Sequence, residues 1–317
     1  MTQSLVVIKE LTKAFGSLTA VDRVSFEIQS GQVVGFIGEN GAGKTTTMRM
    51  MVTLELPDSG SIHIKGHNAL EYPDMVRHMV GWMPDSYGVY QFMTVREYMD
   101  FFARAYGFRG AERHRRIDEV MEFTELNTIH DRPVDKLSKG MGQRLCLGRT
   151  LLPDPEILVL DEPAAGLDPK ARIEFKNLVR LLADQGKTLF ISSHILSELE
   201  QMCDSLLFIS KGKIVHHGSS ESLKSREGEP VMVRIELAGT NYAQLAEWVS
   251  CQPGISIFEQ DASGMRIRMD DGSRAHLSMI LQRLQSAGFE VCEFHREKVR
   301  LEDAFVDIIN RNAGGGM

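Results

Sequence analysis

Residues 38–46 read Gly-Glu-Asn-Gly-Ala-Gly-Lys-Thr-Thr, a glycine-rich stretch between two segments of different pattern. The apolar run Val33–Ile37 precedes it, and residues 45–54, without Pro or Gly, follow it as a predicted helix. This order is typical of a phosphate-binding loop, because glycines let backbone N–H groups converge where the helix also directs its positive dipole end. The residues predicted to bind phosphates are Gly38, Glu39, Asn40, Gly41, Ala42, Gly43, Lys44, Thr45 and Thr46.

Two side chains of this loop have predicted chemical roles. Lys44 would add a full positive charge for the outer phosphates, and the hydroxyl of Thr45 would hold a magnesium ion that bridges them. A chance glycine-rich turn before a helix is the alternative, and the complete G-x-x-x-x-G-K-T pattern between a strand and a helix disfavours it. We therefore expect a nucleoside triphosphate site.

Length and charge limit the possible functions. A chain of 317 residues exceeds the size at which one core usually keeps growing, so about two domains are expected. The 36 Lys and Arg against 43 Asp and Glu leave a net charge of −7, which argues against a broad nucleic-acid-binding face but not against a local patch. No run of about 18 apolar residues occurs and no secretion signal is visible, so any membrane-spanning part is expected in another chain.

The cysteines indicate neither disulfides nor a zinc site, because they are far apart and show no C-x-x-C spacing. They are Cys146, Cys203, Cys251 and Cys292. We expect buried free thiols in a reducing compartment.

An aromatic residue lies in the first predicted turn. Residues 5–8 and 24–28 are short strand-like runs, and Phe15 lies between them, just before Gly16. An exposed ring there could stack on a base, a contact worth about 1 to 3 kcal/mol in single-stranded nucleic acid complexes. An ordinary core phenylalanine is the alternative.

Residues 80–93 predict an irregular loop rich in aromatic residues, followed by a helix. Thr94 and Glu97 have the spacing of a capping box at its start. The apolar residues that recur at helical spacing and are expected in the core are Tyr98, Phe101, Phe102 and Ala105. The loop aromatics Tyr87, Tyr90 and Phe92 are either buried or form a docking patch for a partner.

Ser138 and Gly140 precede a second predicted helix that ends before Pro153. Serine is a natural N-cap, and glycine lets another group approach the backbone closely. Alone, the pair could be only a helix cap.

Two predicted strands end in polar residues. The wholly apolar run Ile157–Leu160 is typical of a parallel strand buried on both faces, and Asp161 and Glu162 follow it. Residues 188–191 predict another strand, which leads to His194. Because ligands bind at the carboxyl ends of open parallel sheets, one acid could face a metal ion and the other an attacking water.

The phosphate loop, Leu-Ser-x-Gly at 137–140, the strand ending in Asp-Glu, Ala-Gly-Leu-Asp at 165–168 and the strand ending in His resemble, in this order, the ATP-binding cassette (ABC) ATPases. The resemblance covers about residues 1–220. It implies an α/β fold, a P-loop NTPase cassette with a RecA-like core, an antiparallel β subdomain and a helical subdomain. It also implies ATP and Mg²⁺ as cofactors.

The resemblance implies roles for single residues. Phe15 would stack on adenine. Asp161 would orient the hydrated magnesium ion and Glu162 would polarise the attacking water. His194 would touch the γ-phosphate, and Lys44 would complete the catalytic set.

In the family that this chain resembles, Ser138 and Gly140 would act in trans, capping ATP in a second cassette, so a homodimer or a paired cassette is expected. Lys139 and Met141 depart from the common Leu-Ser-Gly-Gly-Gln. Asp85 stands where many members have Gln; it could meet the magnesium ion and the ATP, while adding negative charge near the γ-phosphate. Both departures are similar to a bacterial export branch whose members drive efflux of drugs, lipids or polysaccharides, or serve membrane processes of unknown cargo.

Residues 229–310 predict a separate accessory domain for regulation or dimerisation, with 311–317 as a flexible tail. Strand-like and helix-like patterns alternate as β-α-β-β-α-β, the order of a ferredoxin-like fold, before a last helix at 301–309. Nine Lys or Arg against thirteen Asp or Glu from residue 228 onward argue against RNA binding.

The resemblance predicts a transport-coupled ATPase subunit, peripheral at the cytoplasmic face of the cell membrane, which drives export by a separate polytopic membrane subunit. No nucleic acid is expected as a partner. A soluble ABC protein acting on ribosomes or DNA is the alternative, disfavoured by the single phosphate loop and the negative charge. A catalytically dead binding module is disfavoured because Lys44, Asp161, Glu162 and His194 are all present.

Overall fold

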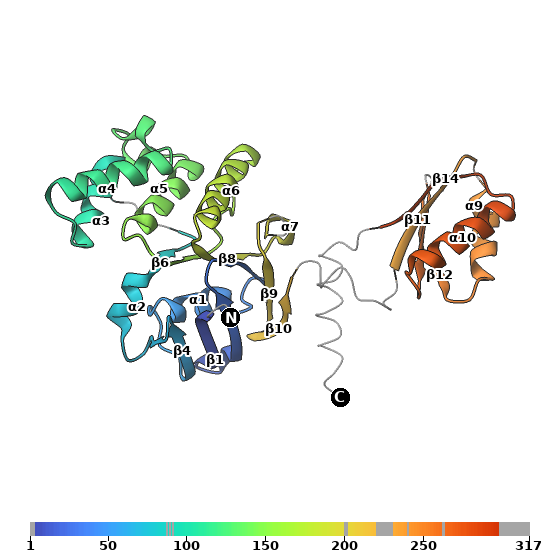
Figure 1. Ribbon diagram of the computed structural model, residues 1–317, viewed down its shortest axis with the longest axis horizontal. Coiled ribbons are helices and arrows are strands. Elements are labelled where there is room, and N and C mark those ends of the chain that lie inside the picture. The colour runs from blue at the N-terminus through green and yellow to red at the C-terminus, as the bar shows by residue number, and fades with distance from the viewer. Residues whose placement is uncertain are drawn as a thin grey trace. The chain divides into compact units, whose positions relative to one another are not determined.

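The computed structural model describes residues 4–86, 88, 90, 92–199, 202–219, 231–239, 241–261 and 264–297. Its contacts divide the chain into two compact units, residues 1–219 and 220–317 (Figure 1). Buried apolar clusters fill each unit. In the part of the chain that the structure describes, no helix is both long and apolar enough to cross a membrane.

A four-stranded antiparallel sheet in the first unit has the order β2-β1-β4-β5. Its strands are β1 (Ser4–Phe15), β2 (Leu18–Gln29), β4 (Ser59–Ile64) and β5 (His67–Asn68). The runs expected at 5–8 and 24–28 are parts of these longer strands. The pairing register of β1 with β2 shifts between Ile8 and Leu11, and Glu10 there has a positive φ of 48°. Such a bulge interrupts the alternation of buried and exposed residues, which hides the length of the strands in the sequence.

A six-stranded sheet with the order β10-β9-β3-β8-β7-β6 forms the centre of this unit. Its strands are β3 (Val33–Ile37), β6 (Val80–Met83), β7 (Ile157–Leu160), β8 (Thr188–Ser193), β9 (Ser205–Ser210) and β10 (Lys213–Gly218). All neighbours pair in parallel except β10, which is antiparallel to β9. Every residue of β3, β7 and β8 is buried, which confirms the parallel, doubly covered strand predicted at 157–160.

The irregular loop predicted for residues 80–93 is partly wrong, because Val80–Met83 is the edge strand β6. Glycine at 81 makes this packing possible: a Cβ there would lie 2.8 Å from side-chain atoms of Thr150 and Pro155. Gly81 therefore does not mark a turn. It marks a close approach of the strand to the helix that carries Thr150.

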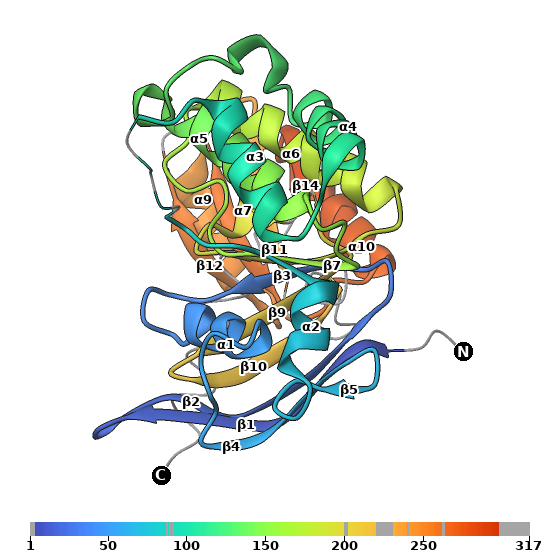
Figure 2. The ribbon, with the colours of Figure 1, turned by 90° about the vertical axis from the view of Figure 1, so that its left-hand side faces the viewer.

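The helices that surround the central sheet have the following bounds: α1 (Lys44–Met51), α2 (Pro73–Met79), α3 (Val95–Ala105), α4 (Gly110–Phe123), α5 (Lys139–Leu151), α6 (Pro169–Asp184) and α7 (Leu196–Leu199), with short 3₁₀ turns at Asn127–Ile129 and Val134–Lys136. Figures 1 and 2 show α3, α4 and α5 together on one side of the central sheet, and the antiparallel sheet on the other. Because β3 ends at Ile37 and α1 begins at Lys44, the glycine-rich loop between them lies at the carboxyl end of β3, where parallel sheets bind ligands.

The capping box of α3 is confirmed. The Oγ1 of Thr94 accepts from the backbone N of Glu97 at 3.3 Å, and the Oε2 of Glu97 accepts from the backbone N of Thr94 at 2.8 Å. The core stripe is only partly right, since Tyr98 is buried but Phe101 is 46% exposed. Val95, Met99 and Ala103 fill the core instead.

The second unit has the element order β-α-β-β-α-β that the sequence predicts. The elements are β11 (Val231–Leu237), α9 (Tyr242–Ser250), β12 (Ile255–Gln260), β13 (Met265–Met269), α10 (Arg274–Ser286) and β14 (Val291–Arg296). The sheet is antiparallel with the order β12-β13-β11-β14, and α9 and α10 pack on one face of it (Figure 1). The predicted last helix, 301–309, and the tail lie outside the described residues.

The prediction that all four cysteines are buried is wrong for Cys251 and Cys292, which are exposed free thiols. Cys251 lies at the C-terminal end of α9, and Cys292 lies on β14, where the pattern leaves it on the solvent side. Burial of the Cys146 thiol on α5 raises its pKa to about 11, so it is an inert packing residue.

Candidate functional site

The glycine-rich loop requires glycine at specific positions. Gly43 caps α1 with a φ of 109°, and a Cβ there would lie 2.4 Å from the carbonyl oxygen of Ala20. A Cβ on Gly38 would lie 2.5 Å from the carbonyl oxygen of Ile209. The loop is therefore pressed against β2 and β9, and only residues without a side chain allow this approach.

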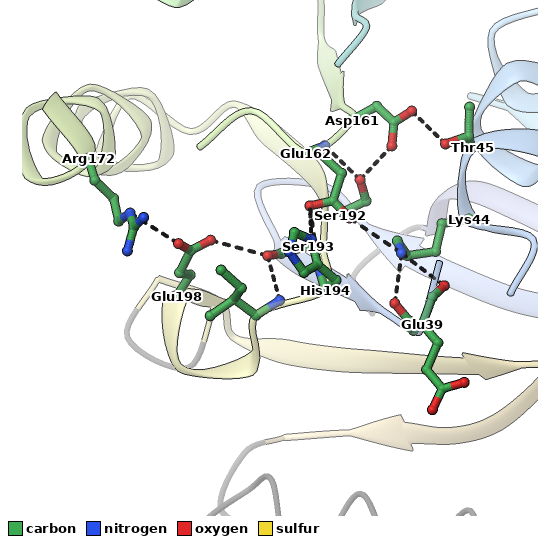
Figure 3. A network of polar contacts seen from close by, with 12 residues as sticks. Glu39, Lys44, Thr45, Asp161, Glu162, Arg172, Ser192, Ser193, His194 and Glu198 are labelled. Atoms are coloured by element: carbon green, nitrogen blue, oxygen red, sulfur yellow. Dashed lines mark hydrogen bonds and ion pairs between the residues drawn. The ribbon is translucent and has the colours of Figure 1, made fainter. Parts of the chain in front are cut away.

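Lys44 is held inside this loop, with its side chain 6% exposed. Its Nζ donates to the carbonyl oxygens of Gly38 at 2.7 Å and Glu39 at 3.3 Å (Figure 3). The same Nζ lies 3.3 Å from the Oε1 of Glu162. The ammonium group thus joins the loop to the acid at the end of β7.

Asp161 connects the first turn of α1 to the end of β8. Its Oδ2 accepts from the hydroxyl of Thr45 at 2.8 Å and its Oδ1 from the hydroxyl of Ser192 at 2.6 Å (Figure 3). Burial raises the pKa of Asp161; the two hydroxyl hydrogen bonds oppose this, while the charges of Glu162 and Asp85 add to it. A cation next to this carboxyl would therefore stabilise its ionised form.

Glu162 lies between Lys44 and His194. It has a positive φ of 47°, and its backbone N donates to the hydroxyl of Ser192 at 2.8 Å. Its Oε2 lies 2.8 Å from the Nδ1 of His194 and also accepts from the backbone N of His194 at 3.3 Å. Its Oε1 is buried and makes the ion pair with Lys44, but it accepts no hydrogen bond from the described residues. A non-glycine residue at positive φ costs on the order of 1 kcal/mol or more, a strain typical of functional sites.

A magnesium ion fits the residues present. Thr45 and Asp161 offer hard oxygen donors side by side, and the Oε1 of Glu162, which makes no hydrogen bond among the described residues, is a further acceptor for a metal-bound or attacking water. No group of three His, Cys, Asp or Glu suited to a metal occurs among the described residues. This donor set matches Mg²⁺, which usually binds through one or two protein oxygens, with phosphates and waters completing its shell.

Ser192 is a site residue that the sequence analysis missed. Its hydroxyl donates to Asp161 and accepts from the backbone N of Glu162, so it fixes both acids at once. Ser-Ser-His at the end of a predicted strand is the signal that could have found it, since Ser192 and His194 follow each other with the period of a strand.

Phe15 lies outside this cluster, near the tip of the β1–β2 hairpin. Its ring is 48% exposed, so the alternative of a core phenylalanine is wrong. The Nζ of Lys13 lies 5.3 Å from the ring centroid. Because Phe15 pairs with Leu18 and β2 then passes Gly43 at Ala20, the hairpin adjoins the phosphate loop.

Ser138 and Gly140 are also outside the cluster. The Oγ of Ser138 caps α5 by accepting from the backbone N of Met141 at 3.4 Å, which confirms the predicted N-cap. A Cβ on Gly140 would lie 2.9 Å from the Cβ of Ala171 on α6. Within the described part of the chain, neither residue makes a hydrogen bond or ion pair with the phosphate loop.

Asp85 interacts with α5, which Ser138 caps, and with Asp161. Its carbonyl oxygen accepts from the Nε2 of Gln143 on α5 at 3.5 Å, and its carboxylate contributes to the raised pKa of Asp161. Asp85, two residues after β6, is thus linked to α5 by a hydrogen bond and to Asp161 by its charge.

A lysine inside a glycine-rich loop, an acid bonded to the first hydroxyl of the next helix, and a second acid beside a histidine define a P-loop ATPase cassette. The family model described as ABC transporter matches residues 21–165. A bacitracin transport ATP-binding protein of Bacillus licheniformis is 35% identical over 309 residues, covering 97% of this chain and 96% of the relative. The chain therefore belongs to the ATP-binding proteins of ABC transporters, and it is an ATP-hydrolysing subunit of the exporter type.

Other relatives and structures agree. A Nod factor export ATP-binding protein of Ralstonia nicotianae is 37% identical, covering 69% of this chain and 68% of the relative. A daunorubicin/doxorubicin resistance ATP-binding protein of Streptomyces peucetius is 31% identical, covering 96% of this chain and 92% of the relative. A solved ATP-binding subunit of an ABC transporter matches with a TM-score of 0.63 and 28% identity, covering 70% of this chain and 92% of the other.

Proposed function

We propose that this chain hydrolyses ATP at a cassette dimer interface and thereby drives export through a separate polytopic membrane subunit. The observation that carries the proposal is the contact network of Lys44, Glu162 and His194. This network joins the phosphate loop to the carboxyl ends of β7 and β8. The relatives' names give bacitracin, Nod factor and daunorubicin or doxorubicin to those proteins. Cargo choice in this protein belongs to the membrane subunit.

The residues of the network have distinct proposed roles. Lys44 and the loop N–H groups bind the phosphates, with Thr46 at the start of α1 and Phe15 on the adenine. When bound through Thr45 and Asp161, with Asp85 nearby, Mg²⁺ would neutralise charge on the phosphates. Glu162 orients the attacking water through its carboxylate and accepts a proton from it, while Lys44 lies beside its Oε1.

His194 is the proposed contact to the γ-phosphate. Its Nδ1 faces the Oε2 of Glu162 at 2.8 Å, and because an ionised carboxylate only accepts, Nδ1 carries the proton in this contact. The opposite nitrogen of the imidazole is thereby set for the substrate side. The histidine thus links the acid that orients the water with the phosphate under attack.

The second half of each site comes, in this proposal, from a second cassette. Ser138 is exposed on α5 and has no contact with its own phosphate loop among the described residues. The chain carries one phosphate loop, so two copies, or this chain and a related one, are needed to make two complete sites. The second unit, assigned to residues 229–310 as a ferredoxin-like accessory domain, would regulate or support that pairing.

Three exposed aromatic residues, Tyr90, Phe92 and Phe101, here called the aromatic patch, are the proposed docking site for the membrane subunit. Tyr87 lies outside the described residues. Phe92 is 95% exposed, and the rings of Tyr90 and Phe101 lie 5.5 Å apart. Apolar side chains gathered on a surface mark protein contacts more often than scattered ones do. Docking there would hold the chain at the cytoplasmic face of the membrane.

The test is membrane association of the double variant Phe92→Asp, Phe101→Asp in cells that contain the membrane subunit. We expect the variant to shift from the membrane fraction to the soluble fraction. Leu181→Asp is the matched control, because Leu181 is also an exposed apolar residue but lies on α6, outside the patch. Equal membrane fractions for the double variant and the control would overturn the docking proposal.

A further inference from the structure

A buried carboxylate outside the phosphate site lies next to the turn that carries His194. Glu198, on α7, is only 5% exposed. Its Oε1 lies 3.1 Å from the Nε of Arg172 on α6, and its Oε2 accepts from the hydroxyl of Ser193 at 3.2 Å. Figure 3 shows Ser193 and His194 between this pair and Lys44. Since a buried charge without partners is unfavourable, Glu198 depends on both contacts.

Ser193 transmits the position of Glu198 to His194. Its hydroxyl donates to Glu198 and accepts from the backbone N of Ile195 at 2.9 Å. The backbone N of Glu198 in turn donates to the carbonyl oxygen of Ile195 at 3.2 Å. Hydrogen bonds to Glu198 and Ile195 therefore hold the turn 193–195 in place. His194 is the middle residue of this turn.

Arg172 connects the same carboxylate to the segment that follows Glu162. Its Nη2 donates to the carbonyl oxygen of Leu167 at 3.2 Å, in the Ala-Gly-Leu-Asp turn before α6. Its Nε makes an ion pair with Glu198 but not a hydrogen bond, because the geometry is not aligned. Arg172 thus holds the turn after Glu162 and the helix after His194 at the same time.

These contacts close a circuit that begins and ends at Glu162. From Glu162 the chain leads to Leu167, then by side-chain contacts through Arg172, Glu198 and Ser193 to His194, and back to the Glu162 carboxylate. The separation of His194 from Glu162 is therefore determined from both sides.

We propose that Arg172, Glu198 and Ser193 are positioning residues for ATP hydrolysis, which hold the 193–195 turn so that the His194 imidazole faces Glu162. The inference rests on the proposed roles of Glu162 and His194. A role in stability alone does not explain the pair well, because buried ion pairs contribute little compared with apolar residues of the same shape.

The test compares Glu198→Gln with the wild-type chain in full-length, purified protein. Glutamine keeps the shape and still accepts from Ser193, but it removes the charge that holds Arg172. We expect kcat for ATP hydrolysis to fall roughly 10- to 100-fold, as for a misplaced catalytic group, with the KM for ATP within about twofold. Arg172→Gln is expected to lose rate as well. Arg172→Lys keeps the positive charge but not the planar set of guanidinium donors, so we expect its kcat to lie between those of Arg172→Gln and the wild type.

Asp100→Asn is the matched control. Asp100 is also a partly buried carboxylate paired with an arginine, 2.7 Å from the Nε of Arg113, but it lies on α3. We expect it to keep the wild-type kcat. If kcat falls in both variants in proportion to their melting temperatures, the positioning role is overturned.

A spectroscopic readout separates orientation from stability. In histidine-labelled protein, the Nδ1–H resonance of His194, identified by its loss in His194→Ala, is expected in wild-type protein and Asp100→Asn but shifted or absent in Glu198→Gln. If Glu198→Gln does not fold, Ser193→Ala is measured in its place, with the same expected fall in kcat. Wild-type kcat and an unchanged His194 signal in the folded variant would overturn the inference alone. Wild-type turnover in His194→Ala and Glu162→Gln would overturn the proposed site roles as well.

Discussion

Glu162 shows how one residue depends on three others. Lys44 lies beside one of its carboxylate oxygens, His194 beside the other, and Ser192 holds its backbone N. The strained φ of 47° is maintained by these contacts, and it directs the side chain away from the path of a continuing strand. A residue held in this way is suited to orient a water molecule rather than to move with the substrate.

Replacing Glu162 by Gln is expected to lower ATP turnover by about 10² to 10⁴, the usual contribution of a general base, while ATP binding is kept. Steady-state phosphate release and a fluorescent-nucleotide binding assay measure the two quantities separately. Turnover near the wild-type value in the folded variant would contradict the proposed role.

Asp161→Asn tests the electrostatics of the metal site through pH. The fold raises the pKa of this buried carboxyl above its ordinary value of 3.8, so the folded chain binds the proton more tightly than the unfolded chain does. The free energy of unfolding therefore falls as the pH rises through these pKa values and stays lower at neutral pH.

Without nucleotide, we expect Asp161→Asn to melt at a higher temperature than the wild type at pH 7, with the difference shrinking in acid. Its Mg²⁺-dependent hydrolysis should be lost, because the metal loses its charged ligand. Thermal scans across pH check the first part and phosphate release the second. A variant that is less stable at pH 7, by an amount that grows in acid, would contradict the sign argued above.

Residues with a motif could be predicted from the sequence, and residues that only support them could not. Lys44, Thr45, Asp161, Glu162 and His194 converge as the resemblance implies. Ser192 has only the weak signal of Ser-Ser-His at a strand end, and Glu198 has no local pattern, since their partners lie at the end of β7 and on α6 and only folding brings them together.

At the scale of elements, the helix caps separate stability from function. Thr94 and Ser138 both cap helices of the same helical group, with Oγ-to-backbone distances of 3.3 and 3.4 Å. Only Ser138 has a proposed contact with the nucleotide of a second cassette. The two caps are thus structurally matched and functionally different.

Thr94→Ala and Ser138→Ala are each expected to lower the free energy of unfolding by about 1 kcal/mol, measured by urea titration. In a Glu162→Gln background, which slows hydrolysis, sedimentation with saturating ATP should show dimers for the parent and for Thr94→Ala, but monomers for Ser138→Ala. A parent that stays monomeric, or dimers of Ser138→Ala as abundant as those of the parent, would contradict the trans-capping role.

Elements with simple periodicity were predictable to within a residue or two. The apolar runs Val33–Ile37 and Ile157–Leu160 match the bounds of β3 and β7, because glycine or polar residues mark the ends of both runs. The long β1 and β2 were underestimated because bulges break their alternation, and β6 was missed because it is a short edge strand with a glycine. Tertiary contacts decide such elements more than local propensity does.

At the scale of the whole molecule, the catalytic network lies entirely within the first unit. The division of contacts after residue 219 separates this unit from the second sheet and its two helices. The bacitracin transport relative from Bacillus licheniformis and the daunorubicin/doxorubicin resistance relative from Streptomyces peucetius match nearly the whole length of this chain.

Capture of a tagged Glu162→Gln chain from gently solubilised native membranes, with ATP and Mg²⁺, tests the coupling of this ATPase to a membrane subunit most directly. We predict that one polytopic membrane protein co-purifies in a fixed ratio, and that the Phe92→Asp, Phe101→Asp variant of the same chain loses it. Co-purification of ribosomes or DNA, or of no membrane protein at all, would contradict the proposal.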